Sequence, residues 1–183
     1  MIRIAAALTC GLLLTACGKG PVDLEKPAEP LGDFELGFAE VVAPNVQKLL
    51  ISRDVPTDEL IASVDAAVEE RFRRYEGGKL YHFGISVEAY SLPPALVPGK
   101  SALALRVTIW DDAKAAKMND ETHLLHVIKV FESRISTNRD AQLKALSQDA
   151  ALEIEKWLRE QQEAVGWFGP IEVDEPASDA AEG

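Results

Sequence analysis

The chain has 183 residues, of which 47% are hydrophobic and 27% are charged, and these values are typical of a globular protein with a single domain. Its formal net charge is -11 at pH 7. This excess of acidic groups repels phosphate backbones and anionic lipid headgroups, which argues against a nucleic-acid binder and against broad docking on an anionic membrane surface.

The first residues have the three parts of an export signal. Arg3 supplies a positive charge, and residues 4–16 form a mostly apolar run. A membrane-spanning helix needs about 20 such residues, so this run is too short to be a permanent span. The sequence therefore predicts that residues 1–16 are a signal peptide.

A cysteine follows this run directly, in the sequence Leu14-Thr15-Ala16-Cys17. These four residues resemble the lipobox of bacterial lipoproteins, in which a leucine and two small residues precede the cysteine. The resemblance covers the signal region alone. It implies that a signal peptidase recognises Leu14, Thr15 and Ala16. It also implies that Cys17 becomes the N-terminus and holds the protein in a lipid bilayer through its acyl chains. An ordinary signal peptide that is cleaved after Gly18 is the alternative.

The resemblance also implies a location in the cell envelope. The residue after the cysteine is Gly18 and not aspartate, which indicates the periplasmic face of the outer membrane by the sorting preference of such lipoproteins. Cys10 lies in the apolar run and would be removed with it. The mature chain would then have no second cysteine with which Cys17 could form a disulfide.

Two segments at the ends of the mature chain are predicted to lie outside its folded part. Residues 18–32 contain three glycines and three prolines, so we expect residues 17–32 to be the lipidated cysteine and a flexible tether. Such a tether could reach about 50 Å when extended. Residues 170–183 are rich in acidic residues and contain no basic one, which predicts an acidic disordered tail.

Residues 33–169 are expected to form one domain, which begins with a strand. Phe34, Leu36 and Phe38 alternate with polar or small residues, which is the period of a strand on one face of a sheet. Residues 48–52 are predicted as a second short extended piece, and the sequence leaves open whether it pairs at the sheet edge.

A helix is predicted to follow. Thr57 precedes two acidic residues and is expected to be the N-cap. Apolar residues then recur every three or four positions until Gly77 and Gly78, which are expected to end the helix.

The sequence of the second half of the domain predicts three strands and one more helix. The strands are expected in residues 81–90, 102–110 and 123–133, and their connections indicate an antiparallel meander. The helix is expected from about Arg139 to Gln162. The order β-α-β-β-β-α predicts an α+β fold, namely a two-layer sandwich in which two helices cover a mainly antiparallel sheet of four to five strands.

The chemistry-bearing residues of the domain form no recognisable catalytic motif. The chain has three histidines, His82, His123 and His126. In a strand, His123 and His126 would point to opposite faces, so we expect no metal site there. The sequence has no Walker loop, no GxGxxG and no nucleophile elbow, and we expect neither a cofactor nor an enzymatic activity.

One aromatic pair is a candidate surface for a partner. Trp167 and Phe168 follow the last helix and are flanked by glycines. They are predicted either to form an exposed apolar patch or to fold back as a lid on the core.

These features indicate an accessory interaction or assembly module of the cell envelope. Cys17 would anchor it in the bilayer, and the partner would be another envelope protein. One alternative is a periplasmic domain that binds a small ligand between its sheet and its helices. The other is a hydrolytic enzyme, which would need distant acids or histidines to be brought together with perturbed pKa values.

Overall fold

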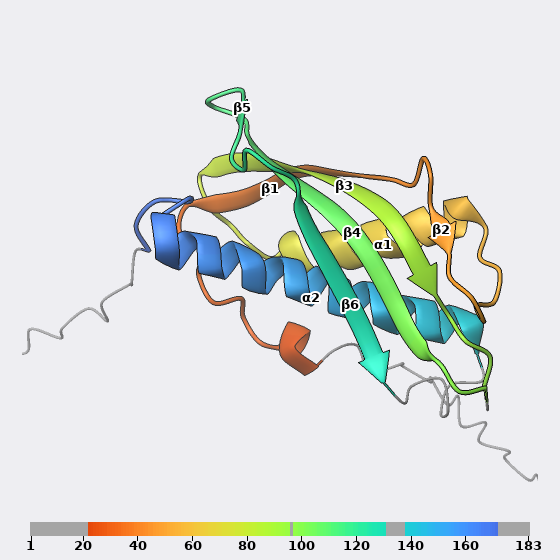
Figure 1. Cartoon of the computed structure of the whole chain (residues 1–183). Coiled ribbons are helices and arrows are strands. Elements are labelled where there is room, and N and C mark those ends of the chain that lie inside the picture. Colours follow the sequence, from red (N-terminus) through yellow and green to blue (C-terminus); the bar gives the residue numbers. More distant parts are fainter. Residues whose placement is uncertain (1–21, 96, 131–137, 172–183) are drawn as a thin grey trace, which may run out of the picture.

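The computed structural model describes residues 22–95, 97–130 and 138–171 (Figure 1). The predicted signal peptide, Cys17 and residues 172–183 of the predicted tail lie outside the described residues. Within the described ranges, no helix is both long enough and apolar enough to cross a bilayer.

The fold is α+β, with one sheet of six strands and two helices in two layers, as the order of the predicted elements indicates (Figure 1). The elements are η1 (Val22–Glu25), β1 (Phe34–Val42), β2 (Gln47–Lys48), α1 (Thr57–Phe72), β3 (Lys79–Ser91), β4 (Lys100–Asp111), β5 (Ala116–Lys117), β6 (His123–Val130) and α2 (Arg139–Val165).

The sheet is mixed. The strand β4 pairs in antiparallel fashion with β3, β5 and β6, which is the predicted meander with one short strand added. By contrast, β1 and β2 both pair with β3 in parallel. The helix α1 connects β2 to β3 and returns the chain to the same end of the sheet, and such a crossover makes the flanking strands parallel. The two-residue strands β2 and β5 raise the count above the four to five strands predicted.

The ends of α1 differ from the prediction. Pro56, and not Thr57, holds the N-cap position, and no side chain caps the helix there. The helix ends at Phe72, before the predicted glycines, because the chain turns to pack on β1. In this turn the Gly77 N–H donates to the carbonyl oxygen of Phe34 at 3.0 Å. A Cβ at Gly77 would overlap the Phe34 backbone, so this close approach requires glycine.

The helix α2 begins where it was predicted. The side chain of Asn138 caps it by accepting hydrogen bonds from the amides of Asp140 and Ala141. The helix continues to Val165, and Gly166 ends it in the left-handed conformation with a φ of 66°.

The core between the layers is centred on one aromatic cluster. Phe34 is 1% exposed and lies 5.1 to 6.2 Å, between ring centroids, from five other rings. These rings come from α1, from β3, and from the segments that follow the two helices. They belong to Phe72, Tyr75, Tyr81, Phe83 and Phe168.

Residues 23–32, which we call the strap, are docked on the helices, so the prediction of a flexible tether is wrong for this part. The Asp23 carboxylate lies 2.7 Å from the guanidinium of Arg71 in α1. Arg159 of α2 donates to the carbonyl oxygen of Glu29 at 2.9 Å. Leu31 is 1% exposed and belongs to the core. The composition of the strap resembles that of a linker, but its few apolar and charged groups find partners on the helices.

A buried polar network lies beneath the strap. The Arg71 side chain is only 2% exposed, and its guanidinium also lies 2.5 Å from the Glu155 carboxylate of α2. The Tyr75 hydroxyl donates to Glu155 and accepts a hydrogen bond from Arg159 at 2.8 Å. Burial, and then the neighbouring Glu155 carboxylate, raise the pKa of the Tyr75 hydroxyl, so it remains a donor. The strap and both helices are therefore joined through one set of charges.

Candidate functional site: the open face of the sheet

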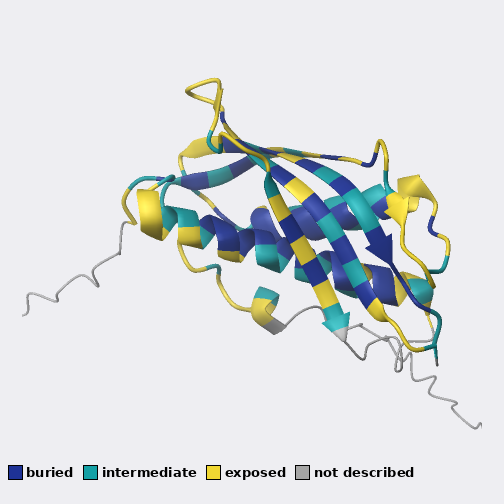
Figure 2. Ribbon diagram, viewed as in Figure 1, coloured by how far each residue is buried: buried dark blue, intermediate teal, exposed yellow. Residues whose placement is uncertain are grey.

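The sheet has one face against α1 and α2 and one face that no described element covers. Figure 2 shows buried and exposed residues alternating along β4 and β6, as expected when only one face of a sheet is packed. We call the uncovered side the open face. Its exposed side chains are available for contact with other molecules.

Three aromatic side chains form a row across the open face. Phe38 of β1 pairs with His82 of β3, and His82 pairs with Trp110 of β4. The rings of Phe38 and His82 stack with their centroids 4.1 Å apart. Phe38 is 53% exposed and Trp110 is 38% exposed. We call these three residues the aromatic row.

A bulge in β1 turns Phe38 onto the open face. Leu36 and Phe38 were predicted to share one face, but the pairing with β3 shifts register between them. Leu36 is consequently buried and Phe38 is exposed. Gly37 lies in this bulge, where a Cβ would overlap the imidazole of His82. The prediction that Phe38 shares a face with Leu36 is therefore wrong, and the bulge is the cause.

Two hydrogen bonds fix the ring of His82 in the row. The amide N–H of Phe38 donates to Nδ1 at 3.2 Å, and Nε2 lies 3.0 Å from a carboxylate oxygen of Asp112. Because an amide can only donate, Nδ1 must accept, and the proton is assigned to Nε2, which donates to Asp112. His82 therefore links the bulge in β1 to the turn that follows β4.

A shallow hollow of about 360 Å³ lies next to the row. Gly84 forms part of its floor, where an added Cβ would meet no atom closer than 4.0 Å. On its rim the Arg106 guanidinium lies 3.6 Å from the Glu88 carboxylate. The hollow offers hydroxyl groups and an ion pair beside the aromatic row. This combination suits a side chain of another protein. Its lining residues include Glu40, Val42, Ser86, Thr108 and Thr122.

The exposed apolar area continues at the other edge of the sheet. Leu124 and Ile128 of β6 are 44% and 57% exposed. They pair with Arg106 and Ala102, which lie on the open face of β4. The open face thus combines aromatic groups on one side, aliphatic groups on the other and a hollow between them.

The three histidines do not come together. His82 lies in the aromatic row, and His126 is exposed on the open face of β6. His123 lies on the opposite face of β6, where its ring stacks on that of Trp157 with centroids 4.2 Å apart. The predicted strand thus separates His123 from His126. In the part of the chain that the structure describes, no three His, Cys, Asp or Glu residues are placed to hold a metal ion.

Phe168 is fully buried, so the candidate patch that it was to form with Trp167 is not available to a partner. Its ring contacts Phe34 and Tyr81 of the core. Trp167 is partly buried and packs edge-on against Trp157, with centroids 5.4 Å apart. The pair lies as a lid on the end of the core. The other predicted site residues, Leu14, Thr15, Ala16 and Cys17, lie outside the described residues.

Apolar side chains that are at most 1% exposed fill the interface between the sheet and the helices. This interface is where the alternative prediction placed a small ligand. Those side chains include Phe83, Leu105, Val107, Leu146 and Ile154.

The sequence contains a signal for one member of the aromatic row. Trp110 is out of phase with the core residues of β4, which already placed it on the outer face.

The stacked His123 predicts a pH dependence of stability. Burial lowers the pKa of His123, although the Glu160 carboxylate acts in the opposite direction. The unfolded chain, with a histidine pKa of about 6.5, then binds the proton more readily than the folded one. The contribution of neutral His123 to the free energy of unfolding is complete above about pH 6.5. It is lost as the pH falls through the lowered pKa of His123.

We expect His123→Gln to weaken this dependence. Urea unfolding of the wild type and the variant between about pH 7.5 and pH 5 should show their free energies of unfolding converging as the pH falls. Curves that stay parallel over this range would contradict the assignment.

No family model and no curated protein matches this chain. Solved structures similar to it include a DUF330 protein from Xanthomonas campestris, with 16% identity, 76% of this chain and 92% of that chain covered, and a TM-score of 0.48. They also include a minor lipoprotein from Acinetobacter baumannii, with 16% identity and a TM-score of 0.35. This match covers 70% of this chain and 94% of that chain. Lipoproteins are thus among the proteins that this chain is similar to.

Proposed function

We propose that this protein is a lipid-anchored accessory module of the cell envelope that binds a partner protein through the open face of its sheet. The observation that carries the proposal is the aromatic row. Phe38 and Trp110 are held out of the core on a face that no described element covers. Exposed apolar patches of this kind mark interaction sites, and aromatic residues are enriched in protein interfaces.

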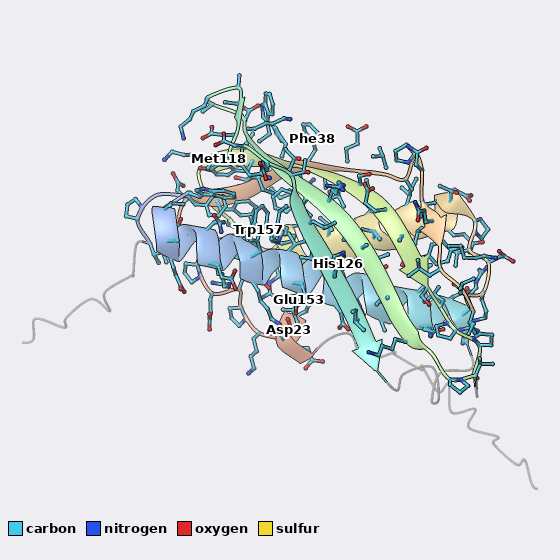
Figure 3. All side chains as sticks on the ribbon, viewed as in Figure 1. Asp23, Phe38, Met118, His126, Glu153 and Trp157 are labelled. Carbon is cyan, nitrogen blue, oxygen red and sulfur yellow. The ribbon has the colours of Figure 1, made fainter. Side chains whose placement is uncertain are left out.

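The predicted anchor supports the same proposal. The residues Leu14-Thr15-Ala16-Cys17 resemble a lipobox, and the strap ties the chain that follows them to the helices. Figure 3 shows Asp23 of the strap and Phe38 of the aromatic row on opposite sides of the molecule. An anchor on the side of Asp23 would leave the open face directed away from the bilayer. The proposal places the domain on the periplasmic face of the outer membrane and assigns it no catalytic step.

The row is tested by recovering partners from envelope membranes that have been solubilised in detergent. We expect the tagged wild-type chain to recover a reproducible partner and Trp110→Ala to lose most of it. Truncating a central aromatic residue of an interface typically weakens binding by about 2 kcal/mol, or roughly 30-fold. The matched control is Val165→Ala at the end of α2, because Val165 is 65% exposed and belongs to the other layer. Equal recovery by both variants would show that the open face is not the binding site.

The anchor is tested separately with Cys17→Ser. This variant lacks the thiol that forms the thioether, so we expect it to leave the membrane fraction or to remain as unprocessed precursor. The folded domain should keep its unfolding midpoint. Mass spectrometry of the wild type should find Cys17 as the N-terminal residue with a diacylglyceryl group. A mature chain cut elsewhere, with Cys17 unmodified, would disprove the anchor.

A further inference from the structure

Three consecutive aliphatic side chains project from the segment that follows β2. Leu50 is 94% exposed, Ile51 is 60% exposed and Leu49 is 43% exposed. We call these residues the apolar tip. Figure 1 places this segment at the end of the molecule where α1 and α2 begin. Single exposed aliphatic residues are ordinary on protein surfaces, but three in succession at a turn are not.

Hydrogen bonds on both sides hold the apolar tip outward. The Leu49 N–H donates to the carbonyl oxygen of Tyr90, and the Arg53 N–H donates to that of Leu92, both at 2.9 Å. The Leu92 N–H donates in turn to the hydroxyl of Ser52 at 2.8 Å. Both ends of the tip are thus tied to the end of β3 and the residue after it. The tip is therefore a fixed projection of the sheet.

The backbone of the tip is strained. Ile51 has a φ of 63°, which is the left-handed region that β-branched residues rarely adopt. A glycine or an asparagine would relieve this strain. The chain instead keeps a large apolar side chain in an unfavourable conformation and exposed to water. Strain of this kind, kept in place by the surrounding hydrogen bonds, is characteristic of functional segments.

The length of the chain before the strap indicates what the tip contacts. Asp23 is already bound to the helices through Arg71, and Cys17 lies only six residues before it. Six residues span at most about 20 Å. A lipid on Cys17 would therefore keep the domain close to the bilayer surface, in contrast to the reach of about 50 Å that a free tether would allow.

This proximity makes a weak contact effective. Burial of three aliphatic side chains alone gives affinities on the order of millimolar, too weak to recruit a free protein to a membrane. Once the chain is anchored, the local concentration of the bilayer is itself in the millimolar range or above. The net charge of -11 disfavours broad docking on an anionic surface, but a small projecting tip can insert without bringing the acidic surface down with it.

We propose that the apolar tip inserts into the bilayer that holds the acyl anchor, and so gives the domain a second contact that fixes its orientation. This inference rests on the proposed lipid anchor at Cys17.

The test uses the full-length acylated protein in phosphatidylcholine vesicles. An environment-sensitive fluorophore is attached to Leu50→Cys, and a matched control carries it on Lys117→Cys, an exposed position in β5. Acylation blocks Cys17, so the introduced cysteine is the only free thiol of the mature chain. At position 50 we expect the emission of the fluorophore to shift to shorter wavelength and to be quenched by nitroxide lipids. At position 117 we expect neither effect.

Three failures can be told apart. If the protein floats with the vesicles but the fluorophore at position 50 stays in water, the tip does not insert, and the anchor stands. If the protein does not float, the anchor is disproved, and the inference fails with it. Shielding of position 50 without quenching by nitroxide lipids would mean that the tip packs on a protein surface, which also overturns the inference.

Discussion

Replacing Arg71 with methionine is expected to lower the free energy of unfolding by about 3–5 kcal/mol. Its guanidinium contacts the carboxylates of Asp23 and Glu155 and is almost completely buried. The substitution keeps much of the side-chain volume but leaves Glu155, which is only 6% exposed, without its closest cation. A loss of this size is a large part of the 5–15 kcal/mol that typically stabilises a domain.

Urea unfolding tests this expectation when Arg71→Met is compared with Lys156→Met, a variant that removes an exposed cation. Lys156 pairs with Glu153 at 2.6 Å on the surface of α2, with 55% and 42% of the two side chains exposed. Exposed pairs contribute about 1 kcal/mol at most, so Lys156→Met should unfold nearly as the wild type does. Equal losses in the two variants would mean that the burial of Arg71 has no energetic consequence.

Phe34→Ala is expected to cost about 3–5 kcal/mol, because it removes the ring at the centre of the aromatic cluster and leaves a cavity that its neighbours cannot fill. Phe34 contacts rings from both layers and from the segment after α2. Its removal therefore weakens the contacts that join β1 to α1, to β3 and to the segment after α2.

The matched control lies four residues further along the same strand. Phe38→Ala changes a ring on the open face that is 53% exposed, so we expect a loss below about 1 kcal/mol. The same variant should bind the proposed partner less well. Chemical unfolding of both variants measures the first expectation, and recovery from solubilised envelopes measures the second. A Phe38→Ala protein as unstable as Phe34→Ala would mean that the open face is packed.

The two elements that the sequence predicted most accurately have strong local signals. In α2, apolar residues recur at helical spacing behind Asn138, and the helix begins at Arg139 as expected. In β4, every second residue is buried, as the alternation predicts. In both elements the local pattern is enough to indicate the type and, within about three residues, the limits.

The features that the sequence did not reveal depend on distant partners. The strap has the composition of a linker, and only the fold brings Asp23 to Arg71 and Glu29 to Arg159. Strand alternation is the same in parallel and antiparallel pairs, so the direction of β1 relative to β3 could not be deduced from it. The bulge at Gly37 changes which face Phe38 occupies, and a single glycine does not predict it. The place of Phe38 in the aromatic row therefore becomes visible only in the folded sheet, whereas the alternation in β4 already puts Trp110 on the outer face.

The strap also has a consequence for the order in which the chain folds. It precedes α1 and α2 in the sequence, so it is synthesised before its two cationic partners, and α2 is the last element that the structure describes. The strap can contact Arg71 once α1 has formed, but it cannot dock completely until α2 has been made, because Arg159 lies on that helix. Until then the strap itself is not held against both helices. On the proposed lipid anchor, this delay would leave Cys17 accessible to the enzymes that acylate and cut the chain, and formation of α2 would then close the strap.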